Sequence, residues 1–181
     1  MKRKLLSLLG IPLLLIFLVF VLPWLVIGIG FQLLPNPPIP EIKQGEFPFK
    51  LVYELNGEQI IVEDTIICKY NGIAAGSNGK SLKWKKFLAN NPKETDVLLK
   101  IEGERKIYYA VGDANYYLGA VEDDMYFKNY DSQQFSTVFY QEPNEVGGIS
   151  SGGISENDLL EEYGIKLISW KPSPPITNTF K

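Results

Sequence analysis

Carboxylates supply most of the chemistry that this sequence could carry out. The acidic residues of interest are Glu63, Asp64, Asp113, Glu122, Asp123, Asp124 and Asp131. Carboxylate oxygens suit Ca²⁺, which takes about six to eight oxygen ligands. We therefore name Asp113, Asp123 and Asp124 as candidate ligands of a calcium ion. The alternative is a solvated acidic surface without a metal, because no EF-hand loop accompanies these residues.

Two carboxylates that face each other could also hydrolyse a glycosidic bond. Such a site would make the chain a carboxylate-dependent hydrolase acting on cell-envelope polymer, but no motif sets the distance between any two acids. The chain contains no histidine, which is the commonest general base and zinc ligand. Its single cysteine, Cys68, therefore has no histidine to activate it. We expect Cys68 to be a small buried residue, and we expect the chain to lack catalytic activity.

Aromatic residues offer a second kind of site, one that binds without reacting. Tyrosines occur in pairs at Tyr108-Tyr109 and Tyr116-Tyr117, and alternation along a strand would turn one of each pair outward. Exposed aromatic rings stack on sugars or anchor protein partners. We therefore name Tyr108, Tyr116, Tyr117 and Trp84 as candidate ligand-binding residues. Packing within the sheet is the alternative interpretation.

Most candidate residues fall in or near short segments that alternate apolar and polar side chains, the period of a half-buried strand. We predict strands at 49–55, 59–63, 65–70, 97–101, 107–111, 116–121, 135–140 and 165–170. Asn56-Gly57 and Gly103 are placed to turn two hairpins. The segment 82–88 could be either a strand or a short helix.

Two glycine-rich segments, 72–80 and 147–155, predict an exposed loop and a mobile loop. One helix is well delimited, because Ser155 can cap its N-terminus and Gly164 suits the position just beyond its C-terminus. The short connections between strands predict a mainly β fold. We expect an antiparallel sandwich or open barrel with one short C-terminal helix, preceded by one transmembrane helix.

Residues 1–34 have the composition of a membrane anchor. Residues 5–34 contain no charge, and a helix needs about 20 apolar residues to cross a bilayer. Three basic residues at positions 2–4 precede this run, and positive charge stays in the cytoplasm. We expect a single-pass helix in the plasma membrane, with a cytoplasmic N-terminus and the rest of the chain outside. The alternative is a signal peptide that is cleaved near Gly28 or Gly30. Signal peptides usually have an apolar region of only about 7–15 residues, which is shorter than the uncharged run here.

Beyond the anchor, the sequence divides into a linker, a domain and a tail. Residues 35–46 begin with four prolines in six residues, which predicts a stiff, extended linker. Residues 47–171 form the predicted β-rich domain, and prolines from position 172 onward predict a disordered tail over 172–181. These three parts hold all 21 acidic residues and all but three of the 18 basic ones. Their acidic balance argues against nucleic acid as a partner and against docking onto anionic lipid.

Several motifs resemble a group of uncharacterised membrane-anchored or exported proteins of Gram-positive bacteria. The motifs are Gly45-Glu46-Phe47-Pro48-Phe49, Leu51-Val52-Tyr53-Glu54 and Val62-Glu63-Asp64-Thr65, with Tyr163-Gly164-Ile165 nearer the C-terminus. The resemblance implies an extracytoplasmic location in such a bacterium, and it implies neither an activity nor site residues. Together with the predicted anchor, it favours a binding or accessory module with a membrane-protein or cell-envelope partner. The hydrolase is the alternative.

Overall fold

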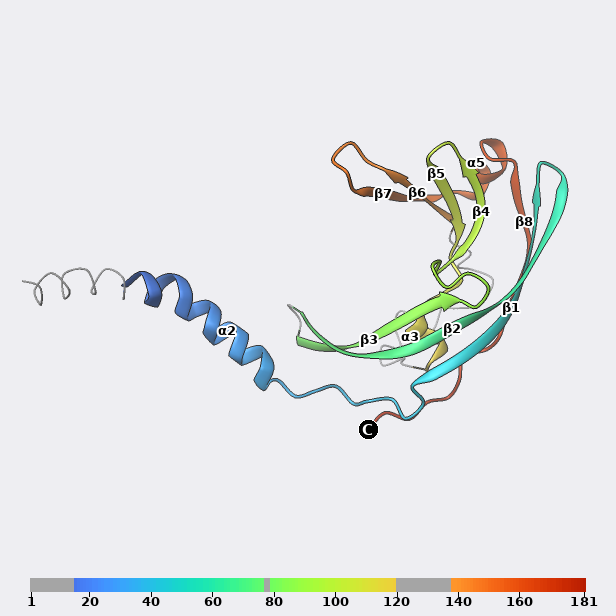
Figure 1. The fold of residues 1–181 in the computed structure, drawn as a ribbon. Helices are drawn as coiled ribbons and strands as arrows, with labels where there is room; N and C mark the ends of the chain where they lie inside the picture. The colour runs from blue at the N-terminus through green and yellow to red at the C-terminus, as the bar shows by residue number, and fades with distance from the viewer. Residues whose placement is uncertain (1–14, 77–78, 120–137) are drawn as a thin grey trace, which may run out of the picture. The chain divides into compact units, whose positions relative to one another are not determined.

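A computed structural model describes residues 15–76, 79–119 and 138–181 of the chain (Figure 1). The chain divides into two units, which are described separately. One unit comprises Met1–Pro38 and Gly72–Lys83, and the other comprises Ile39–Asn71 and Trp84–Lys181.

The first unit contains a π-helical turn, η1 (Phe17–Val21), followed by helix α2 (Leu22–Leu33). Pro23, which has no N–H to donate, stands in the first turn of α2, directly after the π-helical turn. The Lys80 ammonium donates hydrogen bonds to the Leu34 carbonyl (2.8 Å) and to Asn36 Oδ1 (2.9 Å). Among the helices in the described part of the chain, none has both the length and the apolar character that a bilayer crossing requires.

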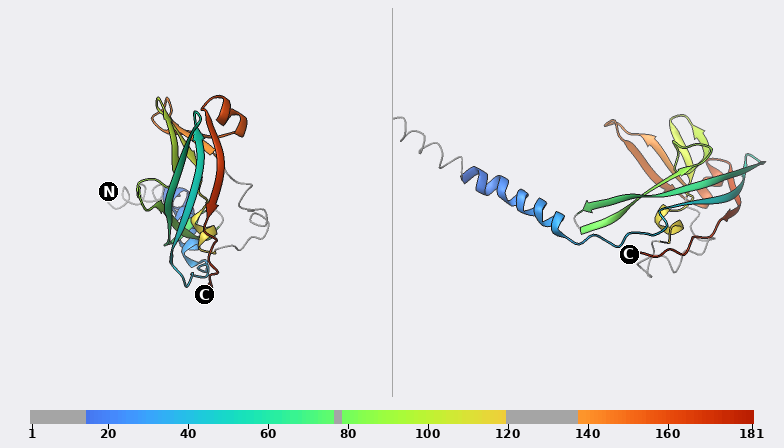
Figure 2. Two further views of the ribbon diagram at one scale, coloured as in Figure 1. Left: turned by 90° about the vertical axis from the view of Figure 1, so that its right-hand side faces the viewer. Right: turned by 60° about the horizontal axis from the view of Figure 1, so that its bottom comes forward.

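One antiparallel sheet has the strand order β3-β2-β1-β8. Its strands are β1 (Gln44–Leu55), β2 (Glu58–Gly76), β3 (Gly79–Leu88) and β8 (Ile165–Pro172). Figure 2 shows β8 running alongside β1. The predicted Asn56-Gly57 turn is confirmed, because both residues have the positive φ that a type I′ turn requires, 54° and 87°.

Strand β2 corrects two predictions made from the sequence. It is one continuous strand, whereas we had predicted separate strands at 59–63 and 65–70 and a loop at 72–80. The continuity follows from pairing with β1, which extends without interruption from Glu58 to Lys69. The ambiguous segment 82–88 is a strand, the latter part of β3.

The second antiparallel sheet has the order β4-β5-β6-β7. Its strands are β4 (Val97–Glu102), β5 (Arg105–Tyr109), β6 (Val138–Pro143) and β7 (Ile149–Ile154). The predicted hairpin at Gly103 is confirmed, with φ of 62° at that glycine. The mobile loop that we predicted at 147–155 is wrong over Ile149–Ile154, which form strand β7 and pair with β6.

The sequence predicted one of the two short helices that the structure describes in the larger unit. Helix α5 (Glu156–Glu161) is confirmed, and Ser155 Oγ accepts a hydrogen bond from Asp158 N (3.2 Å), as a helix N-cap should. The strand predicted at 116–121 is wrong where it is described, because helix α3 (Ala114–Tyr117) takes its place. The Tyr117 hydroxyl donates to the Val111 carbonyl at 2.7 Å and holds the turned conformation.

The segment that we predicted to be a disordered tail, 172–181, is hydrogen-bonded to the start of its unit. Pro40 and Phe180 form a β-bridge, and the Ile39 and Lys181 amides each donate to the other residue's carbonyl. Asn178 adds side-chain hydrogen bonds to Ile42. The prolines at 172, 174 and 175 end strand β8, but they do not prevent this later extended pairing, whose main-chain hydrogen bonds are made by Ile39, Glu41, Thr179 and Lys181.

The hydrophobic core draws on both sheets. Ile66 and Cys68 of β2, Ile107 of β5 and Ile165 of β8 are all inaccessible to solvent, and they belong to one apolar cluster. The Tyr53 hydroxyl crosses between the sheets and donates to the Leu99 carbonyl (3.2 Å). The coarse fold class predicted from the sequence is therefore confirmed: the chain is mainly β, with two antiparallel sheets and a short C-terminal helix.

Candidate functional site

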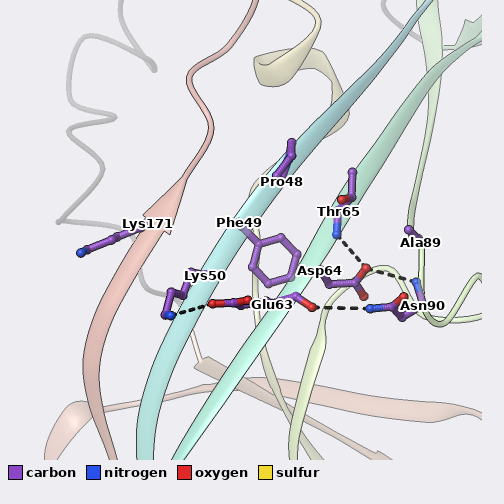
Figure 3. Close-up of a pocket in the computed structure, with 9 residues that line it drawn as sticks. All are labelled: Pro48, Phe49, Lys50, Glu63, Asp64, Thr65, Ala89, Asn90 and Lys171. Carbon is purple, nitrogen blue, oxygen red and sulfur yellow. Dashed lines mark hydrogen bonds and ion pairs between the residues drawn. The ribbon is translucent and has the colours of Figure 1, made fainter.

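Two hollows open in the larger unit, and the first lies across β2, β1 and β8 (Figure 3). It has a volume of about 530 Å³. Three of its four charged side chains have partners: Lys50 Nζ lies 2.6 Å from Glu63 Oε1, and Asp64 Oδ1 accepts from the amides of Thr65 (2.7 Å) and Asn90 (3.1 Å), while Lys171 is the fourth. The Asn90 contact holds the connection after β3 against β2, and the Lys50–Glu63 pair joins β1 to β2, so most of the polar groups here have a structural role.

The second hollow is a cleft beside β8 and β7, each of which lies at one of the two edges of its sheet. Its volume is about 690 Å³. The lining residues are Leu51, Tyr109, Val138, Ile154, Glu156, Leu159, Leu167, Ile168, Ser169, Trp170 and Lys171. Most of them are apolar, and helix α5 contributes Glu156 and Leu159. We call this hollow the edge cleft.

An irregularity in β8 shapes the edge cleft. Val52 of β1 pairs with Ser169, and its neighbour Tyr53 pairs with Leu167, so Ile168 is an extra residue opposite β1. Such a bulge re-aims the side chains that follow it. Leu167 before the bulge and Trp170 after it therefore both pack against the core, although their spacing would place them on opposite faces of a regular strand.

Trp170 forms part of the aromatic wall of the cleft. Its ring centroid lies 5.0 Å from that of Tyr109 and 5.1 Å from that of Phe49, both in tilted arrangements. Aromatic pairs at this distance are attractive beyond the area they bury. Burial raises the pKa of the Tyr109 phenol, so this residue is neutral at physiological pH. This part of the wall is thus aromatic and uncharged.

A polar network holds the turn between α5 and β8, two elements that contribute residues to the cleft. Arg105 donates from Nε and Nη2 to the two carboxylate oxygens of Glu142 (2.8 and 3.2 Å) and from Nη1 to the Tyr163 hydroxyl (2.7 Å). Lys100 Nζ donates to the Tyr163 carbonyl (3.2 Å). The hydrogen bonds from Arg105 lower the pKa of the Glu142 carboxyl.

The four aromatic residues predicted to bind a ligand do not line the edge cleft. Tyr108 is 4% exposed and stacks on Phe139, with 5.4 Å between ring centroids, while Tyr109 is 1% exposed. The expectation that one of these two tyrosines faces solvent is therefore wrong, because both faces of β5 are covered. Tyr117 is also buried, and Tyr116 and Trp84 are half-buried. Trp84 packs edge-on against Tyr70, with a centroid distance of 5.8 Å.

The predicted calcium ligands are only partly described. Asp113 is exposed and precedes α3, where its side chain makes no capping hydrogen bond. Asp123 and Asp124 lie outside the described residues. Across the described ranges, no group of three or more His, Cys, Asp or Glu side chains could hold a metal ion. The calcium site therefore stays a prediction.

Sequence reasoning missed the edge cleft, whose lining comes from six separate elements. One signal was available: the apolar residues Ile165, Leu167 and Trp170 change phase within a single predicted strand, which indicates a bulge. Chemically, the cleft offers an aromatic and aliphatic wall with a carboxylate, a hydroxyl and an ammonium group at Glu156, Ser169 and Lys171. Comparison of the chain with family models, curated proteins and solved structures finds no match.

Proposed function

We propose that this protein is a non-enzymatic binding module that holds a ligand in the edge cleft. The cleft volume of about 690 Å³ carries this proposal. Ligand sites in proteins usually measure about 300–1,000 Å³ and combine apolar walls with a few polar groups. The edge cleft has this composition, with Trp170, Tyr109 and Leu167 as apolar wall and Glu156 and Lys171 as charged groups. A ligand with an apolar body and polar ends fits it best.

We further propose that the module is displayed on the outer face of a bacterial plasma membrane. The uncharged run 5–34 supports a single-pass anchor, and the basic residues at 2–4 support a cytoplasmic N-terminus. The partner would then be the lipid bilayer for the anchor, and a membrane protein or cell-envelope component for the domain. Protease added to intact cells should remove the C-terminal part of the chain, and protection of that part would contradict this placement.

Ligand binding in the edge cleft can be tested with a pair of matched substitutions. Ile168→Glu places a charge in the cleft at a residue that is 45% exposed, and Ile61→Glu places it on β2 at a residue that is 54% exposed and lines neither hollow. The assay screens fragment-sized aromatic and aliphatic compounds against the full chain in lipid nanodiscs. Binding is detected by NMR, through shifts of the Leu and Ile methyl resonances. We expect bound compounds to shift Leu167 and Ile154, and we expect Ile168→Glu alone to abolish the shifts. Compounds that bind both variants equally would place the site elsewhere.

A further inference from the structure

Strand β8 contributes five consecutive residues, Leu167 to Lys171, to the lining of the edge cleft. Successive side chains of a strand point to opposite faces, so a cleft lined by all five must reach around the edge of the strand itself. Within the described residues, β8 pairs with β1 on one side and with no strand on the other. One wall of the cleft is therefore an unpaired sheet edge.

The register of β8 shows which main-chain groups face this wall. Ser173 N donates to the Pro48 carbonyl at 3.0 Å, so these two residues form a hydrogen-bonded pair. Main-chain groups alternate in direction along an antiparallel strand, and the pairing is regular from Ser173 back to Ser169. Lys171 and Ser169 accordingly direct their N–H and C=O groups toward β1. Trp170 directs its own toward the free edge, beside the apolar wall formed by its own side chain.

The outward charges of the sheet form a row that stops at β8. Glu63 of β2 is opposite Lys50 of β1, and Lys50 is opposite Lys171 of β8. Lys50 is bound to Glu63 at 2.6 Å, and Figure 3 shows Lys171 extending away from Lys50. A carboxylate on a further strand would stand beside Lys171 and would complete the row with alternating charge.

We propose that the edge cleft receives an extended peptide segment of a partner protein, which adds to the sheet as a strand next to β8. Its main chain pairs with the free edge at Trp170, its alternate apolar side chains enter the cleft against Trp170 and Leu167, and an acidic side chain meets Lys171. This inference rests on the proposed binding function and identifies the class of ligand. A second copy of β8 is a poorer occupant, because it would bring Lys166 and Lys171 into a like-charged edge.

The test uses three labelled heptapeptides and the full chain in lipid nanodiscs, with binding followed by fluorescence anisotropy. The first peptide alternates valine and glutamate, and the second alternates valine and lysine. The third is the valine–glutamate peptide with N-methyl groups on alternate amides of its pairing edge, which blocks main-chain hydrogen bonds. We expect the first peptide to bind at least tenfold more tightly than the other two. Binding should also slow hydrogen exchange at the Trp170 amide.

Charge-reversed variants test the contact with Lys171. Lys171→Glu should reverse the preference in favour of the valine–lysine peptide, whereas Lys85→Glu, a reversal on an exposed residue of β3, should leave it unchanged. An unchanged preference in Lys171→Glu, or equal binding of the N-methylated peptide, would overturn strand addition. If no peptide binds while fragments still bind in a manner that depends on Ile168, strand addition is wrong and the proposed binding function stands. If fragments do not bind either, both are wrong.

Discussion

Individual side chains in the core are held by burial and by short-range polar pairing. Cys68 is fully buried, and burial raises the pKa of its thiol to about 12, from an ordinary value of 9.0. The sequence predicted the burial because Cys68 alternates with Ile66 on one face of a strand, and that prediction is confirmed. Tyr108 and Tyr109 were harder to place, because alternation separates two faces and does not say whether both are covered.

Cys68 should not react with alkylating reagents in the folded protein. The thiolate is the species that reacts with alkylating reagents, and at pH 8 neither ionisation nor access favours it here. We expect iodoacetamide to leave Cys68 unmodified in the native chain at pH 8 and to modify it fully in concentrated urea. Mass spectrometry gives the extent of labelling without ambiguity, because the chain has a single cysteine. Rapid labelling of the native chain would show that the region around β2 opens.

Asp96 should contribute more to the free energy of unfolding than Glu63, which forms an exposed ion pair with Lys50. Its Oδ1 accepts from Lys86 Nζ (2.8 Å) and from Val111 N (3.1 Å), and the Lys86 and Asp96 side chains are each 13% exposed. Asp96→Asn leaves the Lys86 ammonium without its counter-charge, and we expect a loss of about 2 kcal/mol in the free energy of unfolding. Glu63→Gln is the control, with an expected effect of less than about 1 kcal/mol, because its pair with Lys50 is exposed. Urea unfolding of both variants measures the two losses in the free energy of unfolding. Equal losses would contradict this ranking.

At the scale of the element, the sequence predicted turns and helix caps correctly, but it did not predict which glycine-rich segments pair as strands. Asn56-Gly57, Gly103 and Ser155 each specify a turn or a cap through their own backbone preferences, and each is confirmed. By contrast, the glycine-rich segment 147–155 forms a strand only because β6 lies beside it. Within this strand, Gly152 leaves room for a neighbour, since a Cβ there would lie 2.8 Å from the Tyr140 ring. Composition alone could not distinguish that requirement from a loop.

Gly164 should be required where α5 meets β8. Its φ is 66°, and a Cβ at this position would lie 2.2 Å from Asn56 Oδ1, so strain and a steric clash both oppose a side chain. We expect Gly164→Ala to lower the free energy of unfolding by about 1–3 kcal/mol. Gly153→Ala provides the comparison, because an added Cβ meets no atom within 4 Å and φ is not positive. Similar unfolding midpoints for the two variants would mean that the Asn56 loop moves aside without cost.

On the scale of the whole molecule, the fold class followed from the sequence but the site did not. Alternating segments and short connections indicated two-layer β structure, because every such strand must bury one face. The edge cleft depends instead on which strands become sheet edges and on a bulge of one residue at Ile168. Both depend on pairing between strands that are far apart in the sequence, such as the pairing of Leu51 with Trp170. No local pattern around either residue contains that information.

The pH dependence of stability should include a contribution from the Arg105–Glu142 pair. Hydrogen bonds from Arg105 lower the pKa of Glu142 below its ordinary value of 4.5, so the unfolded chain takes up this proton first as the pH falls. The contribution is therefore complete above about pH 4.5 and is lost as the pH falls through the depressed value. We expect Glu142→Gln to be less stable than wild type at pH 7, and we expect the difference to shrink as the pH falls below 4.5. A difference that stays constant with pH would exclude this origin.

The C-terminal segment should stabilise the point where the chain enters the larger unit. The Asn178 side chain makes three hydrogen bonds to two residues: its Oδ1 accepts from Ile42 N (3.0 Å), and its Nδ2 donates to the carbonyls of Ile42 and Leu118 (both 2.9 Å). Since each hydrogen bond contributes on the order of 1 kcal/mol net, Asn178→Ala should cost about 1–2 kcal/mol, locally rather than throughout the unit. Hydrogen exchange should therefore accelerate at the Ile42 amide and stay unchanged at Ile66 in the core. The neighbouring Thr177→Ala, at an exposed residue, serves as the control. Equal acceleration in both variants would mean that the main chain of the C-terminal segment, rather than the Asn178 side chain, holds residues 39–42 in place.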